Sequence, residues 1–117
     1  MAKTGDHGGQ CVAYAKAQLK PSSGITGNGN TWYNNTTYCT KLSGIQSKCA
    51  ACWSGGSGGY GHVAVVESWN STSKTMTYSD SNYKGDEKVI VRTGLTEADM
   101  KKLFGSSYTF QGYVTLK

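Results

Sequence analysis

The sequence lacks several features that mark particular classes of protein. No apolar run approaches the roughly 20 residues that a membrane-spanning helix needs, so we expect no membrane insertion. The basic residues are scattered: twelve Lys and Arg stand against seven Asp and Glu, and only Lys101 and Lys102 are adjacent. Nucleic-acid binding usually needs a basic stripe or cluster, and we therefore expect no nucleic-acid partner. The net charge of +5 favours a weak attraction to polyanionic surfaces.

Proline and phenylalanine are scarce, with one and two residues, whereas Gly, Ser, Thr, Asn and Tyr are abundant. This composition favours a twisted sheet with polar turns over a helical bundle. A chain of 117 residues has room for one hydrophobic core, so we expect a single, monomeric domain over residues 1–117. The sequence opens without a signal-peptide pattern, which predicts release by another route or a domain cut from a longer chain.

The first half of the chain predicts one helix and a long polar connection. Residues 11–19 are good helix formers without a breaker, and Pro21 ends the helix. Residues 24–48 are polar and predict a surface connection with one helical turn near Trp32.

The second half predicts an antiparallel sheet. A capping-box variant at Thr96 predicts a short helix that reaches Phe104. Apolar and β-branched segments predict strands over 49–53, 62–69, 75–80, 88–92 and 108–116. The fold class is therefore α+β, with an N-terminal helix packed on an antiparallel sheet.

The cysteines allow several states. The spacing of Cys49 and Cys52 is compatible with a zinc site or a redox pair, and a Cys39–Cys49 disulfide is a further option. The same segment is typical of a buried strand, in which Cys52 is a small hydrophobic side chain. A zinc site needs two more ligands at suitable spacing, and the two histidines are isolated. We predict no metal and no cofactor.

Cys11 and His62 are the candidates for nucleophilic catalysis. Cys11 lies in the first turn of the predicted helix, where the helix dipole favours the thiolate that attacks. His62 opens the most β-like segment, and its face of the strand carries Ala64 and Val66, which leave room for a helix to pack there. A neutral histidine can take the thiol proton. The alternatives are a buried helical cysteine and an exposed histidine at a strand end.

A catalytic base needs a partner that orients its second ring nitrogen. Asp80 and Asn82 follow the next predicted strand and project from one face. A hairpin would bring this strand back along residues 62–69 and place one of the two side chains behind His62. The other interpretation of Asp80-Ser81-Asn82 is a simple turn.

Together these segments resemble the CHAP family, the cysteine- and histidine-dependent amidohydrolases and peptidases. The matching blocks, in chain order, are Gly9–Cys11, Gly27–Trp32, Ala51–Trp53, Gly61–Glu67, Ser79–Asn82 and Phe110–Val114. The resemblance implies a papain-like core of the NlpC/P60 type. It also implies that Cys11 is the nucleophile, that His62 is the base, and that Asp80 and Asn82 occupy the positions of the family's acidic residue and asparagine. The family often has Glu where this chain has Asp80.

The resemblance further implies hydrolysis of an amide bond in bacterial peptidoglycan, as in endolysins and autolysins. Such an enzyme acts at the cell wall, outside the cytoplasm, as an N-acetylmuramoyl-L-alanine amidase or a cross-bridge endopeptidase. We expect the backbone N–H of Cys11, with Gln10, to stabilise the oxyanion. The candidate aromatic walls of a substrate groove are Trp32, Tyr33, Trp53 and Tyr60. The alternatives are a non-catalytic wall-binding module and another papain-like amidase, such as an injected antibacterial effector.

Overall fold

The computed structural model describes residues 2–117 and has the α+β architecture that the sequence predicts. The strands of this part are β1 (Cys39–Lys41), β2 (Cys49–Gly55), β3 (His62–Asn70), β4 (Thr75–Ser81), β5 (Val89–Leu95) and β6 (Tyr108–Leu116). They form one antiparallel sheet in the order β1-β6-β2-β3-β4-β5. The helices are α1 (Cys11–Leu19), α2 (Gly29–Trp32) and α3 (Glu97–Met100), and η1 (Ser57–Gly59) is a short 3-10 turn.

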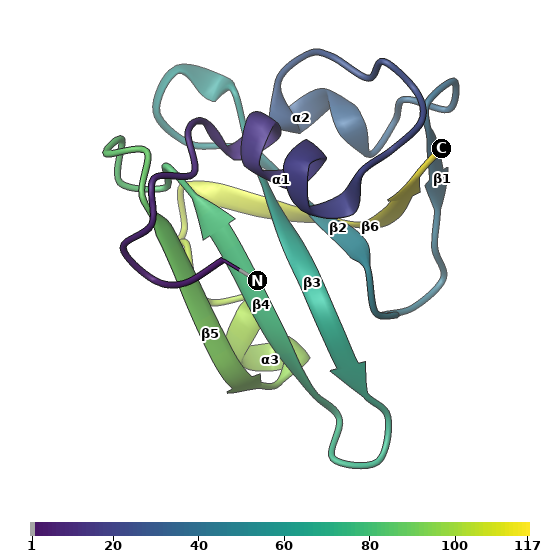
Figure 1. Cartoon of the computed structure of the whole chain (residues 1–117), viewed down its shortest axis with the longest axis vertical. Coiled ribbons are helices and arrows are strands. Elements are labelled where there is room, and N and C mark those ends of the chain that lie inside the picture. The colour runs from purple at the N-terminus through teal and green to yellow at the C-terminus, as the bar shows by residue number, and fades with distance from the viewer. Residues whose placement is uncertain (1) are drawn as a thin grey trace.

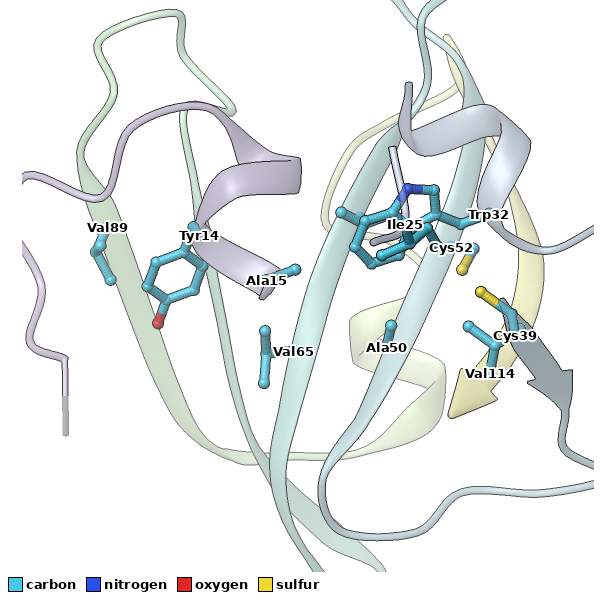
Figure 2. Packing of buried hydrophobic residues seen from close by; sticks show 11 residues of the cluster. Tyr14, Ala15, Ile25, Trp32, Cys39, Ala50, Cys52, Val65, Val89 and Val114 are labelled. Atoms are coloured by element: carbon cyan, nitrogen blue, oxygen red, sulfur yellow. The ribbon is translucent and has the colours of Figure 1, made fainter. Parts of the chain in front are cut away.

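The helices lie on both faces of the sheet. Helices α1 and α2 cover one face, and α3 lies behind the other (Figure 1). The first face buries a cluster in which Ala15 of α1 points toward Val65 of β3 and the Trp32 ring of α2 lies beside Cys52 of β2 (Figure 2). The second face buries a more aromatic cluster that includes Phe104, after α3. The central strand β3 is therefore covered on both sides.

Local sequence signals fix the ends of α1. The helix spans the predicted residues, and Lys20 leaves it in a left-handed conformation (φ 50°) directly before Pro21. Helix α3 is shorter than predicted, although the Thr96 side chain accepts the expected capping bond from the Asp99 N–H at 3.2 Å. After Met100 the backbone changes to tighter i→i+3 bonds, which end the α-helix before Phe104.

The structure corrects two expectations about the sheet. The polar connection over residues 24–48 contains β1, a three-residue strand that pairs with the end of β6. Helix α1 does not pack on the face of β3 that carries Ala64 and Val66. It packs on the face of Val63 and Val65, because the opposite face is filled by the aromatic cluster.

The cysteines are free, and the Cys39–Cys49 disulfide considered from the sequence is contradicted. Cys39 belongs to the cluster under α1, whereas Cys49 belongs to the cluster on the other face of the sheet. Cys52 is a fully buried strand residue, in agreement with its interpretation as a small hydrophobic side chain. Burial raises the pKa of the thiols of Cys39, Cys49 and Cys52, to about 11 for Cys49.

None of the helices described over residues 2–117 combines the length and apolar character that crossing a bilayer requires.

Candidate active site

Cys11 and His62 meet where β3 and β4 separate. The ladder between these strands includes Val65 and Ser79 but no pair nearer the start of β3. Cys11, the first residue of α1, lies beside this end of β3 and lines the same cleft as His62. It is near enough to the His62 ring for each group to shift the pKa of the other. The separation of the two strands thus lets a thiol on one face of the sheet reach a ring that packs on the other.

Strand β4 uses its alternating side chains to hold both partners in place. On the α1 face, the Tyr14 hydroxyl donates to Ser79 Oγ at 2.7 Å, and Ser81 Oγ donates to the Gly9 carbonyl at 2.7 Å. On the opposite face, Asp80 Oδ2 lies 2.8 Å from His62 Nε2. One strand therefore anchors the cysteine helix with its serines and the histidine ring with its aspartate.

The contact with Asp80 determines how the His62 ring is turned. Because Nε2 is occupied by the carboxylate, Nδ1 is the nitrogen left to face the Cys11 thiol. Asp80 is completely buried, and its second oxygen, Oδ1, lies 3.7 Å from Nη1 of Arg92 on β5. A buried carboxylate is costly unless positive charge compensates it, and the imidazolium and the guanidinium both lie next to this one.

The geometry favours a thiolate–imidazolium pair. Burial by itself would raise the pKa of Cys11, but the hydrogen bond and positive charge of His62, with backbone bonds from Val63 and Val12, lower it below 9.0. Burial by itself would lower the pKa of His62, but the hydrogen bonds and charges of Asp80 and Cys11 raise it to about 9. Each member of the pair stabilises the charged form of the other.

Asn82 does not contact His62 in the structure. It has a left-handed conformation (φ 67°), and its Oδ1 accepts the Glu87 N–H at 2.8 Å. Its carbonyl accepts the Gly85 N–H at 3.0 Å. The Asn82 side chain therefore closes the loop between β4 and β5. The sequence left open whether Asp80 or Asn82 would hold the His62 ring. Asp80 makes that contact, and Asn82 shapes the loop beside the site.

Helix α2 fixes the backbone of His62 from behind. A Cβ atom at Gly29 would lie 2.8 Å from the His62 carbonyl carbon, so only glycine allows α2 to approach this closely. At Gly61, where φ is 71°, a Cβ atom would lie 2.3 Å from the Trp53 carbonyl oxygen. Asn30 ties the two segments together, because its N–H donates to the Tyr60 carbonyl at 3.0 Å and its Nδ2 donates to the Gly59 carbonyl at 2.9 Å.

Three aromatic residues that the sequence did not single out surround the His62 ring. The ring centroids of Tyr83, Phe104 and Tyr108 lie 5.9, 4.9 and 6.3 Å from that of His62. They come from three separate segments, the loop after β4, the turn after α3 and the start of β6. Together they form an aromatic wall along one side of the imidazole ring.

A cleft of about 570 Å³ opens at the thiol and the ring. Its lining residues come from the N-terminal end of α1, the start of α2, the loop before β3 and the loop after β4, and include Cys11, His62, Asn28, Tyr83, Lys84 and Tyr108. Gln10 is exposed at the rim as the residue before α1. The backbone N–H of Cys11 is one of the first four of the helix, which have no partner within it.

Of the four aromatic residues proposed as groove walls, the structure places only Tyr60 in the cleft. Tyr60 lines it and is 62% exposed. The prediction that Trp32 and Trp53 line the groove is wrong. They are 0% and 1% exposed and belong to the two core clusters, so they cannot touch a ligand. Tyr33 is half-buried against Gly112, with the Lys41 Nζ 4.4 Å from its ring centroid.

The arrangement of cleft, thiol and buried base is suited to nucleophilic attack on a carbonyl group. A thiolate at a helix tip can attack, and the adjacent imidazolium can donate a proton to the leaving group. The N–H groups at the start of α1, which have no partner within the helix, are donors of the kind that stabilises negative charge on a carbonyl oxygen. The chemistry that these groups support is acyl transfer.

Comparison with known proteins identifies the family of this chain. The CHAP domain family model matches residues 2–82. The "Probable autolysin LDP" of Staphylococcus aureus (strain NCTC 8325 / PS 47) is 39% identical over an alignment of 85 residues, with coverage of 66% of this chain and 29% of that protein. This chain therefore spans less than a third of the length of that relative.

Two crystal structures of Ly7917 are similar in fold, one of them titled "with the hydrolyzing product of MDP". They have TM-scores of 0.54 and 0.53, 16% identity, and coverage of 97% of this chain and 55% of theirs. At that identity the likeness concerns the fold alone. The family match covers more than half of the chain and includes Cys11, His62 and Asp80. The chain belongs to the CHAP domain family.

Proposed function

We propose that this protein is a peptidoglycan hydrolase that cleaves an amide bond by cysteine nucleophilic catalysis. The observation that carries the proposal is that Cys11 lies beside His62 at the mouth of a cleft, and that the buried Asp80 holds the His62 ring at 2.8 Å. In this proposal Cys11 is the nucleophile, His62 is the acid and base, and Asp80 is the residue that positions the ring. We include in the proposal that the cysteine helix on the antiparallel sheet is a papain-like core.

The reaction follows from these positions. The Cys11 thiolate attacks the carbonyl carbon of the amide, and the oxygen takes up negative charge beside the N–H groups at the start of α1. The His62 imidazolium gives its proton to the departing amine as the C–N bond breaks. Neutral His62 then takes a proton from water, the hydroxide attacks the thioester, and the product carboxylate leaves as the thiolate and imidazolium form again.

Peptidoglycan as the substrate is supported by the family and by the relative named as an autolysin. The cleft agrees with a polar peptide substrate, because tyrosine hydroxyls, amides and the Lys84 ammonium surround the thiol. We place the activity at the bacterial cell wall. We leave two bonds as candidates, the N-acetylmuramoyl-L-alanine amide and a cross-bridge peptide bond, because both need the same catalytic groups.

The test compares lysis of purified cell walls by the wild type and three variants. We expect Cys11→Ala and His62→Ala to abolish the loss of turbidity. The matched control His7→Ala, at the one other histidine, should keep the wild-type rate. Circular dichroism checks that each variant is folded. Clearing of walls by folded Cys11→Ala would contradict the catalytic proposal, and so would wall binding by the wild type without release of fragments.

Mass spectrometry of the released fragments then identifies the bond. An amidase leaves muramic acid without its peptide and a peptide with a free N-terminal alanine. An endopeptidase leaves the peptide attached to the sugar and opens the cross-bridge.

A further inference from the structure

A second cavity, of about 660 Å³, lies on the α1 side of the sheet and shares no lining residue with the catalytic cleft. It is bordered by the segment before α1, by α1 itself and by the far part of β3. Its charged and polar lining residues include Asp6, Gln18, Lys20, Lys48 and Glu67. Glu67 follows His62 by five positions, which corresponds to about 16 Å along a strand. A ligand in this cavity therefore does not contact the catalytic thiol.

Glu67 stands out as a buried carboxylate without a partner. The register of β3 against β4 shifts between Val66 and Ser68, which leaves Glu67 as the extra residue of a β-bulge. Its side chain is on the face of Val63 and Val65, under α1. Only 5% of Glu67 is exposed, and its Oε2 is buried without a hydrogen-bond partner among residues 2–117.

The neighbouring groups of the protein do not neutralise this carboxylate. The Tyr14 hydroxyl, which lines the same cavity, donates its proton to Ser79 at 2.7 Å. The salt bridges found over residues 2–117 join His62 and Arg92 to Asp80, on the opposite face of the sheet. An unpaired buried carboxylate costs far more than an exposed one, unless a cation from outside the described residues compensates it.

The charges around the cavity indicate which cation would fit. Glu67 is the buried carboxylate of the cavity, whereas Asp6 is exposed at its border. A single buried negative charge suits a monovalent group that donates several hydrogen bonds. Lys20 and Lys48 at the rim are exposed and positively charged, so they oppose a divalent metal ion but attract a carboxylate. A small ligand with an ammonium group at one end and a carboxylate at the other satisfies both parts of the cavity.

We propose that the cavity between α1 and β3 binds a free amino acid or short peptide, with the ammonium group of the ligand on Glu67 and its carboxylate at Lys20 and Lys48. This accessory site is separate from the catalytic cleft and does not depend on the proposed hydrolase activity. It would hold a peptide end while the thiol acts on another part of the molecule or on another substrate chain.

The experiment is an NMR titration of the full chain carrying Cys11→Ala, which prevents hydrolysis. The probe is the dipeptide Ala-Ala, and the control ligand is N-acetyl-Ala-Ala, which lacks the ammonium group. We expect saturating shifts of the backbone amides of Gln18, Lys48 and Glu67 with the dipeptide and none with the acetylated control. The sample for this titration is acetylated at its N-terminus, so that no terminal amino group of the protein can serve as the cation.

Two variants test the role of the carboxylate. Glu67→Gln keeps the shape of the side chain without the charge and should weaken binding about tenfold or more. Gln18→Lys introduces a cation from α1 into the same cavity, with little change in helix propensity, and should also abolish binding. Gln18→Lys leaves Glu67 in place, so it remains informative if Glu67→Gln does not fold.

Absence of saturable shifts, equal binding of the acetylated dipeptide, or unchanged affinity in either variant would overturn the proposal. If Glu67→Gln and Lys48→Met lower Tm to the same extent, Glu67 forms an internal ion pair with Lys48 in place of a ligand site. That result would also overturn the proposal. Wall lysis by the wild type is measured in parallel. Its loss or retention bears on the proposed function alone.

Discussion

The Oδ2 atom of Asp80 lies 2.8 Å from Nε2 of His62, inside the protein, where the carboxylate has no exposure to solvent. Because this contact occupies Nε2, it leaves Nδ1 as the ring nitrogen that faces the Cys11 thiol. The following predictions concern this pair and the groups that support it.

Asp80→Asn should reduce kcat/KM about 100-fold or more, because the amide neither stabilises the imidazolium nor enforces its orientation. The pKa of His62, raised to about 9 in the wild type, should fall toward its ordinary 6.5. Wall lysis and NMR titration of the ring measure the two effects. Asn82→Ala is the matched control, and we expect a much smaller loss because Asn82 bonds the loop backbone. A larger loss in Asn82→Ala than in Asp80→Asn would contradict the assignment of Asp80.

Activity should follow a bell-shaped dependence on pH. Activity should rise with pH as Cys11 loses its proton, because its pKa is lowered below the ordinary thiol value of 9.0. Activity should then fall near pH 9, as His62 loses its proton. The raised pKa also means that folded His62 holds its proton more tightly than unfolded His62. Its contribution to the free energy of unfolding is therefore complete below pH 6.5 and is lost as the pH rises through about 9. If the activity fell already near pH 6.5, that result would contradict the ion pair between His62 and Asp80.

Arg92→Met should shift the acidic limb of the pH profile upward by about half a pH unit or more, because it removes a positive charge 3.7 Å from Asp80 Oδ1, and with less positive charge around the site the Cys11 thiol loses its proton less readily. Arg92→Lys retains the charge and should shift the limb less. The measurement is kcat/KM against pH for the three proteins. If Arg92 acts only by filling space, Arg92→Met should change Tm but leave the acidic limb of the pH profile where it is in the wild type.

Gly29→Ala should impair catalysis without touching a catalytic group. The new Cβ atom would lie within 3.0 Å of three backbone atoms of His62, so α2 or the histidine must move. A displacement of 1 Å at a catalytic group can cost about 100-fold in rate. Gly24→Ala is the matched control, because a Cβ atom there meets nothing within 4 Å. Equal kcat in both variants, measured by wall lysis at saturating substrate, would show that α2 does not position the base.

The sequence predicted the parts of the fold and site that depend on local signals. Helix α1 has good helix formers and Pro21 after it, so its bounds could be inferred within a residue. The proximity of Cys11, His62 and Asp80 followed from a helix, a strand and the return strand of a hairpin. The two blocks that carried the family resemblance surround Cys11 and His62, and the family match confirms that resemblance.

The wrong predictions from the sequence concern places where one local sequence pattern is compatible with two different tertiary arrangements. Both faces of β3 are apolar, so alternation could not reveal that α1 covers Val63 and Val65. Trp32 and Trp53 are equally suitable for a groove and for a core, and burial decides between them only in three dimensions. The aromatic wall around His62 comes from three distant segments, so no local spacing could have indicated it.

The unequal environments of the four thiols provide a means of counting functional molecules. Cys11 is only partly buried and has a lowered pKa, whereas the other three lie inside the core with raised values. An alkylating reagent such as iodoacetamide reacts with thiolates, so near neutral pH it should modify this one sulfur first. A preparation can thus be titrated by the addition of a single carbamidomethyl group, with the remaining cysteines left in their natural state.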